Sequence, residues 1–317
     1  MAHPSTTVLS PYRGRLAPSP TGYLHVGHAR TFFTAFERAR DAGGTLVMRM
    51  EDLDRDRSRI EYANAAIDDL HWLGIDWQEG PDISGPYEPY VQSLRQDVYF
   101  AAWKRLRHAN FIYPCSCSRK DQAAALSAPH EDTRPAQDTL DDEPVYPGTC
   151  RPPRMEVSQS DGPEETEEDS PGVINWRFRV PDGETIDFTD LNLGPQRFVA
   201  GVDFGDFLIW RRESATGPRA GLGSRGGGVP SYQLACVADD ATMEITEVVR
   251  GADLLKSTAR QILLNRALGF RDPAWYHCSL VTDQKGLRLA KRHDALSIRS
   301  LRQLGRTQTE VISPELR

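Results

Sequence analysis

The feature that most constrains the fold is a strand–helix–strand pattern near the start of the chain. A short strand over 14–20 ends at two prolines, which cannot donate hydrogen bonds to a sheet ladder. A helical pattern over 28–43 closes on glycines that suit a left-handed cap, and a buried-type strand follows over 45–50. Strands joined by a helix of this length pair in parallel, so we expect a nucleotide-binding type of α/β sheet.

The rest of the chain continues as a mixture of helices and strands. Apolar residues at three- and four-residue spacing predict further helices over 61–74, 91–110 and 254–269. Strands are predicted over 173–180, 184–190 and 197–212. A single basic helix and a tail are expected after residue 294.

Length and composition favour a cytoplasmic protein. The 317 residues are enough for one large or two medium domains, and 39% hydrophobic with 26% charged residues is a typical globular balance. No run approaches the ~20 apolar residues of a membrane helix. The first 15 residues lack the apolar core of an export signal. We therefore expect a cytoplasmic protein with no membrane partner.

The negative charge of the chain is concentrated in one segment. The net charge is −7, but residues 119–170 hold 14 acidic and 5 basic residues, which leaves the remainder at +2. A nucleic-acid partner is therefore not excluded. Because the segment over about 120–172 is acidic, rich in Pro and Ser, and poor in bulky apolar residues, we predict a disordered insertion there.

Two histidines and a glycine, His25, Gly27 and His28, open the first helix. A helix N-terminus carries roughly half a positive charge and unpaired N–H groups, which suit a phosphate. Imidazoles three residues apart lie on one face, where both can donate to a polyphosphate. The residues alone leave two interpretations open, a nucleotide site or a proline-rich turn with surface histidines.

The segment 18–28, PSPTGYLHVGH, resembles the HIGH signature of class I aminoacyl-tRNA synthetases in the form of the glutamyl-tRNA synthetases. The resemblance implies that His25 and His28 are catalytic, contacting the ATP phosphates and stabilising the pentavalent transition state. It also implies that Gly27 binds ATP. Preorganised donors of this kind each contribute roughly 3–4 kcal/mol.

A second match, RMEDLDRDRS over 49–58, resembles the family pattern R-x-E-D-x-D. The family's glutamate holds the α-ammonium of the substrate, and Glu51 occupies that position at the carboxyl end of a predicted parallel strand. By the same comparison the L-glutamate pocket is lined by Arg15, Leu16, Ala17, Pro18 and Ser19. Arg15 is suited to pair with a carboxylate.

A third match covers residues 229–255, VPSYQLACVADDATMEITEVVRGADLL, and resembles a long block of the same family. Tyr232 and Arg250 occupy the positions that contact the glutamate substrate. A lone tyrosine or arginine would carry little weight, but these two stand among more than twenty matching residues.

A fourth match departs from the family pattern. GLRLAKRHD over 286–294 lies where the mobile KMSKS loop belongs, and Lys291 matches its second lysine. Arg288, Ala290 and Arg292 replace other positions of the motif. The resemblance makes Lys291 catalytic and ATP-binding. The retained positive charge suits phosphate stabilisation, although Arg and Lys are not interchangeable and loop closure can differ.

Two short motifs do not indicate a site. DFG over 203–205 lacks the other kinase motifs, and GLGSRG over 221–226 precedes Val-Pro rather than a helix.

Three of the five cysteines gather in a metal-ligand pattern. Cys115 and Cys117 form C-x-C, and Tyr146 and Cys150 form Y-x-x-x-C after a gap of 28 residues. In a reducing cytoplasm such a pattern favours metal binding over disulfides. It resembles the zinc site of the short glutamyl-synthetase paralogues, which implies one structural Zn²⁺ held by these four residues. Cys236 and Cys278 are predicted to be buried thiols.

The resemblance also implies the fold class and the domains. We expect an α/β class I synthetase with a Rossmann-type parallel sheet, an inserted acceptor-binding and zinc subdomain, and a short helical C-terminal region. The first half of the catalytic domain covers 1–112, the insertion 113–200 and the second half 201–280, with the KMSKS-like loop and the C-terminal helix over 281–317. Only 26 residues follow Lys291, which leaves no room for an anticodon-binding domain.

These features together resemble the short glutamyl-queuosine tRNA(Asp) synthetases. The resemblance implies a monomeric ligase that adenylates L-glutamate with ATP and Mg²⁺ and transfers glutamate to queuosine in tRNA(Asp). Three alternatives stay open at this point. They are a truncated glutamyl-tRNA synthetase that charges tRNA(Glu) with a separate partner, an amino-acid ligase for a non-tRNA acceptor, and a binding module without turnover.

Overall fold

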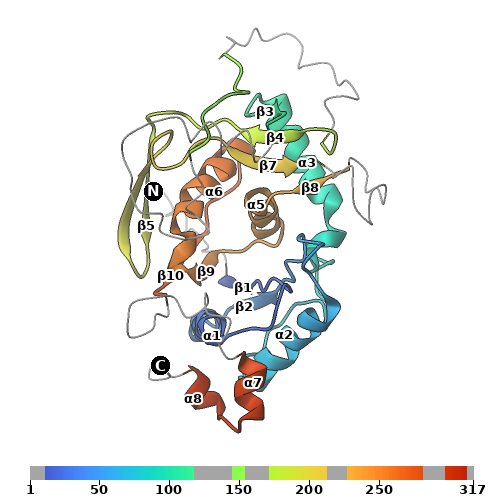
Figure 1. Ribbon diagram of the computed structural model, residues 1–317. Helices are drawn as coiled ribbons and strands as arrows, with labels where there is room; N and C mark the ends of the chain where they lie inside the picture. Colours follow the sequence, from blue (N-terminus) through green and yellow to red (C-terminus); the bar gives the residue numbers. More distant parts are fainter. Residues whose placement is uncertain (1–10, 118–144, 154–170, 213–226, 281–296, 313–317) are drawn as a thin grey trace, which may run out of the picture. The chain divides into compact units, whose positions relative to one another are not determined.

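The computed structural model describes residues 11–117, 145–153, 171–212, 227–280 and 297–312, which have a mixed α/β fold. They belong to two compact units (Figure 1). The first unit takes its residues from Met1–Val91, Met243–Arg250 and Pro273–Arg317. The second takes them from Gln92–Thr242 and Gly251–Asp272.

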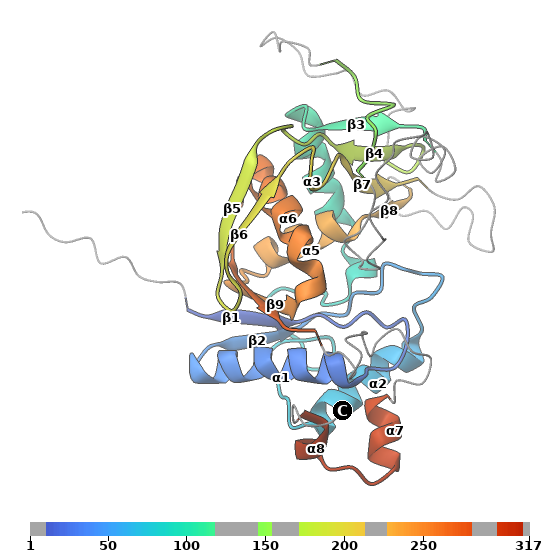
Figure 2. The same ribbon diagram turned by 60° about the vertical axis from the view of Figure 1, so that its left-hand side comes forward.

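The first unit contains the strand–helix–strand pattern, which confirms the predicted parallel pair. Strand β1 (Arg13–Leu16) pairs in parallel with β2 (Thr45–Met48), and helix α1 (Val26–Asp41) connects them. Figure 2 shows α1 running along this pair. The helix buries a stripe of residues at three- and four-residue spacing, which are Ala29, Phe32, Ala35 and Ala39.

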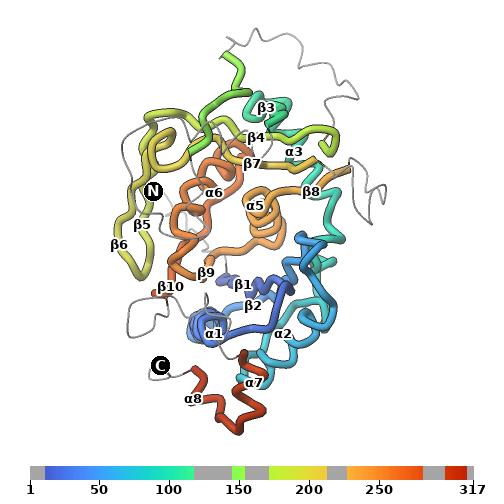
Figure 3. The backbone as a smooth tube through the Cα atoms, viewed as in Figure 1, coloured from blue at the N-terminus to red at the C-terminus, as the bar shows by residue number. Residues whose placement is uncertain are grey.

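The remaining elements of the first unit are α2 (Ile60–Trp72), β9 (Glu247–Gly251, in this unit as far as Arg250), β10 (Ala274–Cys278), α7 (Ile298–Gln303) and α8 (Gln308–Ile312). A backbone hydrogen bond from the N–H of Thr246 to the carbonyl of Arg13 brings the chain that leads into β9 beside β1. Helix α7 packs on α2 and α8 on α1, and the tube in Figure 3 follows this return of the chain. Ile298, Leu301 and Val311 thereby join the core that lies under β1 and β2.

Two short helices stand where one C-terminal helix was predicted. Helix α7 ends before Gly305, which has a φ of 77° and forms a left-handed turn. Thr307 then begins α8, because its backbone N–H and hydroxyl both donate to Glu310. Sequence reasoning missed this pair of Thr307 and Glu310, which separates the two helices.

The described residues of the second unit form a four-stranded sheet, a hairpin and three α-helices. Strands β3 (Ile112–Cys115), β4 (Asn175–Phe178), β7 (Phe207–Arg211) and β8 (Val229–Pro230) pair antiparallel in that order. Strands β5 (Thr185–Asp190) and β6 (Gly194–Val199) form the hairpin. Helices α3 (Gln96–His108), α5 (Tyr232–Thr242) and α6 (Leu255–Leu268) pack on one another, and the short 3₁₀ turns η1 (Gln92–Leu94) and η3 (Ala252–Leu254) precede α3 and α6.

The predicted strand over 197–212 is wrong, because the structure divides it into the end of β6 and the whole of β7. A turn separates the two strands at Gly201, whose φ is 83° and whose N–H donates to the carbonyl of Phe204. Asp203 closes the turn by accepting a hydrogen bond from the backbone N–H of Val199. Apolar residues on both sides of the turn hid it in the sequence.

A buried carboxylate joins α3 to α5. Asp239 accepts hydrogen bonds from Gln92, Arg95 and Tyr99 at distances of 2.6–2.9 Å. These donors compensate the cost of burying its charge.

In the part of the chain that the structure describes, no helix is long and apolar enough to cross a membrane.

Candidate active site and candidate metal centre

The two histidines of the HIGH-like motif meet at the start of α1. His25 is the N-cap residue, and its Nδ1 accepts a hydrogen bond from the backbone N–H of Gly27 at 3.1 Å. Nδ1 of His28 accepts from the backbone N–H of His25 at 3.3 Å. The two rings stack with centroids 3.7 Å apart. The histidines thus replace the usual Ser, Thr or Asp as caps of this helix.

These capping bonds determine which ring nitrogen carries the proton. Because Nδ1 acts as an acceptor in His25 and in His28, the proton of each neutral ring lies on Nε2. Desolvation by the surrounding chain and the neighbouring His25 imidazole lower the pKa of His28 below its usual value, although the residue is exposed and solvent therefore limits the desolvation. The pair is therefore suited to donate hydrogen bonds as neutral imidazoles.

Gly27 lies against the His25 ring and has a specific steric role there. A Cβ atom at this position would lie 3.0 Å from Cε1 and 3.1 Å from Nδ1 of His25. A larger residue would therefore require the His25 ring to shift by a few tenths of an ångström. The resemblance had implied only that this glycine binds ATP.

The parallel pairing of β1 and β2 continues beyond the strands and aligns the second motif with the first. The backbone N–H of Glu51 donates to the carbonyl of Pro18 at 3.0 Å. Glu51 is 8% exposed, and its carboxylate pairs with Nη2 of the buried Arg49 at 2.9 Å. The pocket-lining segment and Glu51 thus lie side by side at the carboxyl end of the pair, where such sheets bind ligands.

Two predicted glutamate-binding arginines are buried in the first unit. Arg15 donates from Nη1 to the carbonyl of Val249 at 2.7 Å. Arg250 donates from Nε to Nε2 of His277 at 3.1 Å and lies 5.1 Å from the Trp275 ring centroid. His277 is an acceptor here and therefore carries its ring proton on Nδ1. Sequence reasoning missed His277 and Trp275, which carry no motif of their own.

The structure does not describe the whole predicted site in one unit. The first unit contains the HIGH-like residues, Glu51, Arg250 and the segment from Arg15 to Ser19. Tyr232 is the first residue of α5 in the second unit. Lys291 with its loop, the GLGSRG segment and most of the acidic insertion lie outside the described residues. The roles of these residues stay predictions.

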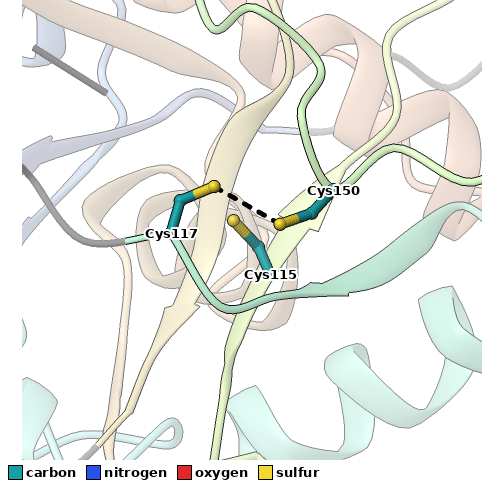
Figure 4. A group of neighbouring side chains, drawn as sticks. All are labelled: Cys115, Cys117 and Cys150. Carbon is teal, nitrogen blue, oxygen red and sulfur yellow. Dashed lines mark hydrogen bonds between the residues drawn. The ribbon is translucent and has the colours of Figure 1, made fainter. Parts of the chain in front are cut away.

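The predicted metal ligands gather in the second unit (Figure 4). The Sγ atoms of Cys115, Cys117 and Cys150 all lie within 4.8 Å of one another. Oη of Tyr146 lies 3.5 Å from the first of these sulfurs and 3.3 Å from the second. It also accepts a hydrogen bond from the backbone N–H of Cys150 at 2.9 Å. Cys115 ends β3, so the sheet fixes one side of the cluster.

The donor set fits a zinc ion. Zinc bonds of about 2.3 Å to sulfur and 2.0–2.2 Å to oxygen keep neighbouring ligand atoms of a tetrahedron roughly 3.5–3.8 Å apart. The contacts of Tyr146 with Cys115 and Cys117 are close to that spacing. The sulfurs of Cys117 and Cys150 are 3.3 Å apart, far beyond the roughly 2.05 Å of a disulfide.

Burial raises the pKa of Tyr146, and the pKa of Cys117 is also raised, so among these three groups the electrostatics favour the anion only at Cys150. Burial raises the pKa of Cys150, but hydrogen bonds involving Cys117, Tyr146 and Ser116 outweigh it and lower this pKa to about 6. Arg177, in β4, donates to Sγ of Cys115 at 3.3 Å. No sequence pattern indicates the contact of Arg177 with Cys115, because the two residues are 62 positions apart.

The other two cysteines lie apart from this cluster. Cys236 is buried in α5 as predicted, and its thiol donates to Asp240 at 3.4 Å. Cys278 lies in β10 and is only partly buried, so the prediction of a buried thiol is wrong for it. It is the last residue of β10 and packs against the core of the first unit.

The chain belongs to the class I tRNA synthetases (E and Q), because the model of their catalytic domain matches residues 12–313. Its fold is accordingly that of a class I synthetase catalytic domain, and the use of ATP follows from the family.

Two relatives named glutamyl-Q tRNA(Asp) synthetase are similar over most of their length. The protein of Symbiobacterium thermophilum is 46% identical, over 94% of this chain and 84% of its own length. That of Nitratidesulfovibrio vulgaris is 44% identical, over 92% of this chain and 82% of its own length. Glutamate–tRNA ligase 2 of Nitrosococcus oceani is 40% identical, and the chain spans 56% of that relative.

A solved structure has a similar fold. The glutamate tRNA ligase of Elizabethkingia meningosepticum, solved in complex with its amino acid, is 27% identical with a TM-score of 0.68. The match covers 94% of this chain and 54% of that one.

Proposed function

We propose that this protein adenylates L-glutamate with ATP and transfers the glutamyl group to queuosine in the anticodon of tRNA(Asp). The observation that carries the proposal is the 44–46% identity to two glutamyl-Q tRNA(Asp) synthetases over more than 80% of their length. In the first step a carboxylate oxygen of glutamate attacks the α-phosphorus of ATP, and pyrophosphate leaves. In the second step a hydroxyl oxygen of the queuosine cyclopentene diol attacks the acyl carbon, and AMP leaves.

The HIGH-like pair supplies the phosphate end of the proposed site. The Nε2–H groups of His25 and His28 donate to phosphate oxygens, and Gly27 keeps the first ring in place. Lys291 adds positive charge at the transferring phosphate. Mg²⁺ enters with ATP, bound mainly by phosphates and water.

The strand ends supply the amino-acid end of the proposed site. Glu51 binds the α-ammonium group, because it follows β2 at the carboxyl end of the parallel pair, where its backbone N–H donates to the carbonyl of Pro18. Arg15 and Arg250 bind carboxylate oxygens. Leu16 and Ala17 complete the wall, and Tyr232 is proposed as a further glutamate-binding residue.

A structural zinc ion held by Cys115, Cys117, Tyr146 and Cys150 is part of the proposal. When bound, zinc crosslinks the end of β3 to the segment 145–153 and performs no step of the reaction. We also propose the predicted domain boundaries, with 113–200 as the acceptor-binding and zinc subdomain. A monomer in the cytoplasm, where ATP and tRNA are available, completes the proposal.

The decisive experiment follows labelled glutamate. The protein is incubated with ATP, labelled glutamate and one of three RNAs, which are tRNA(Asp) with queuosine, tRNA(Asp) without it and tRNA(Glu). We expect label only on the first RNA, and nuclease mapping should place it in the anticodon. Label at the 3′ end of tRNA(Glu) would instead identify a truncated glutamyl-tRNA synthetase. Adenylate formation with no labelled RNA would indicate another acceptor.

A further inference from the structure

A buried arginine lies against the candidate metal centre. Arg177 is the third residue of β4 and is 2% exposed. Strand β4 pairs with β3 so that Cys115 lies opposite Asn175, two residues before Arg177. Alternate residues of a strand point to the same face of a sheet. The arginine is therefore held by backbone pairing next to the first cysteine ligand.

The guanidinium of Arg177 makes two different contacts with the predicted ligands. Its Nε donates to Sγ of Cys115 at 3.3 Å. Its Cζ lies 3.8 Å from the ring centroid of Tyr146, a cation–π contact at close range. Nη1 donates to the carbonyl of Asp206 at 2.9 Å, which fixes the plane of the group.

One donor of this guanidinium has no protein acceptor. Nη2 of Arg177 is buried and has no hydrogen-bond partner among the described residues. Nη2 lies on the same edge of a guanidinium as Nε, so both N–H groups of this edge face the side of the thiolates. An arginine is thus arranged to offer two donors to a sulfur cluster.

The net charge of the zinc-loaded ligand set explains why a cation such as Arg177 is needed beside it. Three thiolates and a tyrosinate around Zn²⁺ carry a net charge of about −2, and burying that charge is costly unless a cation compensates it. Tyr146 and the cysteines have little surface exposed to solvent. Arg177 brings one positive charge into contact with a thiolate and with the phenol ring together.

We propose that Arg177 is a positioning residue of the metal centre, which stabilises the anionic ligand set through Cys115 and Tyr146. The inference rests on the proposed zinc site and assigns to it a partner outside the ligands themselves. Hydrogen-bonded partners of this kind orient ligands and adjust their donor strength.

The test compares zinc binding by full-length variants that have been freed of metal. Zinc affinity is measured by competition with a chromophoric chelator. We expect Arg177→Met to bind zinc about 10- to 100-fold more weakly than the wild type. Arg177→Lys, which keeps the charge but not the fork, should lie between the two. The matched control is Arg179→Met, because Arg179 lies two residues further along the chain and contacts the Tyr113 ring and the carbonyl of Pro152 but none of the four predicted ligands.

A spectroscopic measurement separates positioning from a loss of folding. With Co²⁺ in place of zinc, the sulfur-to-cobalt charge-transfer band reports the electron density on the thiolates. Loss of the N–H···S bond to Cys115 should move this band to lower energy in both Arg177 variants and leave it unmoved in Arg179→Met. Unchanged zinc affinity and an unchanged band in both Arg177 variants would overturn the inference and leave the zinc site standing. A wild type that binds no zinc would overturn both proposals.

Discussion

The imidazole rings of His25 and His28 stack at 3.7 Å while each accepts a backbone N–H at Nδ1. One arrangement therefore caps α1 and fixes the tautomer of both rings. Protonation at Nδ1 of either ring would break a capping bond and place a positive charge against the other ring. The helix start is thus built to present two Nε2–H donors.

Removal of one donor should slow adenylate formation. We expect His28→Ala to lower glutamate-dependent exchange of pyrophosphate into ATP by at least about tenfold, or 1.4 kcal/mol. Lys291→Ala should act in the same direction. His108→Ala, an exposed histidine at the end of α3, is the control and should keep wild-type exchange. Wild-type exchange in both His28→Ala and Lys291→Ala would refute their assignment.

A single methyl group at Gly27 should have a similar effect by a different route. In Gly27→Ala the new Cβ would lie 3.0 Å from the His25 ring, which must then shift by a few tenths of an ångström against its capping hydrogen bond with the Gly27 N–H. We expect reduced pyrophosphate exchange and a raised KM for ATP, with an unchanged KM for glutamate. Gly22→Ala is the control, because a Cβ there meets nothing within 4 Å. Equal KM values for ATP in the two variants would contradict the steric argument.

The lowered pKa of His28 predicts how stability depends on pH. In the unfolded chain this histidine titrates near its ordinary value of about 6.5, whereas the folded protein keeps it neutral to lower pH. The unfolded state therefore binds more protons below pH 6.5, and stability contributed by neutral His28 is lost as the pH falls. Urea unfolding at pH 7.5 and 5.5 measures this loss. It should be smaller in His28→Asn than in the wild type, and an equal loss would contradict the assignment.

The carboxylate of Glu51 can be tested by removal of its charge alone. Glu51→Gln keeps the shape of the side chain but no longer attracts an α-ammonium group. We expect the KM for glutamate to rise by at least about tenfold, which corresponds to 1.4 kcal/mol, with little change in the KM for ATP. Asp54→Asn is the control, because Asp54 pairs with Arg57 on the exposed turn of the same motif. A KM for glutamate that rises equally in both variants would exclude a specific role.

Local patterns predicted the elements that local interactions determine. The parallel pair around α1 followed from strand, helix and strand in sequence, and the sulfur cluster followed from ligand spacing. What escaped prediction depends on partners distant in sequence. His277 reaches Arg250 across 27 residues, and Arg177 reaches Cys115 across 62, so no local pattern marks either contact. The turn at Gly201 was hidden because apolar residues continue on both sides of it.

The last prediction concerns the zinc content of the protein and the contribution of zinc to its thermal stability. Protein purified without chelator should contain one zinc ion per chain, and Cys117→Ser should lose most of it, because one of four ligands is replaced by a poor one. Cys278→Ser is the matched control, since Cys278 lies in the first unit and outside the cluster. Chelation should lower the Tm of the wild type and leave that of Cys117→Ser nearly unchanged, because zinc binding free energy contributes to folding only where the ligand set is complete. Purified protein without stoichiometric zinc, or equal chelator effects on the two proteins, would show that the cluster is a group of packed thiols.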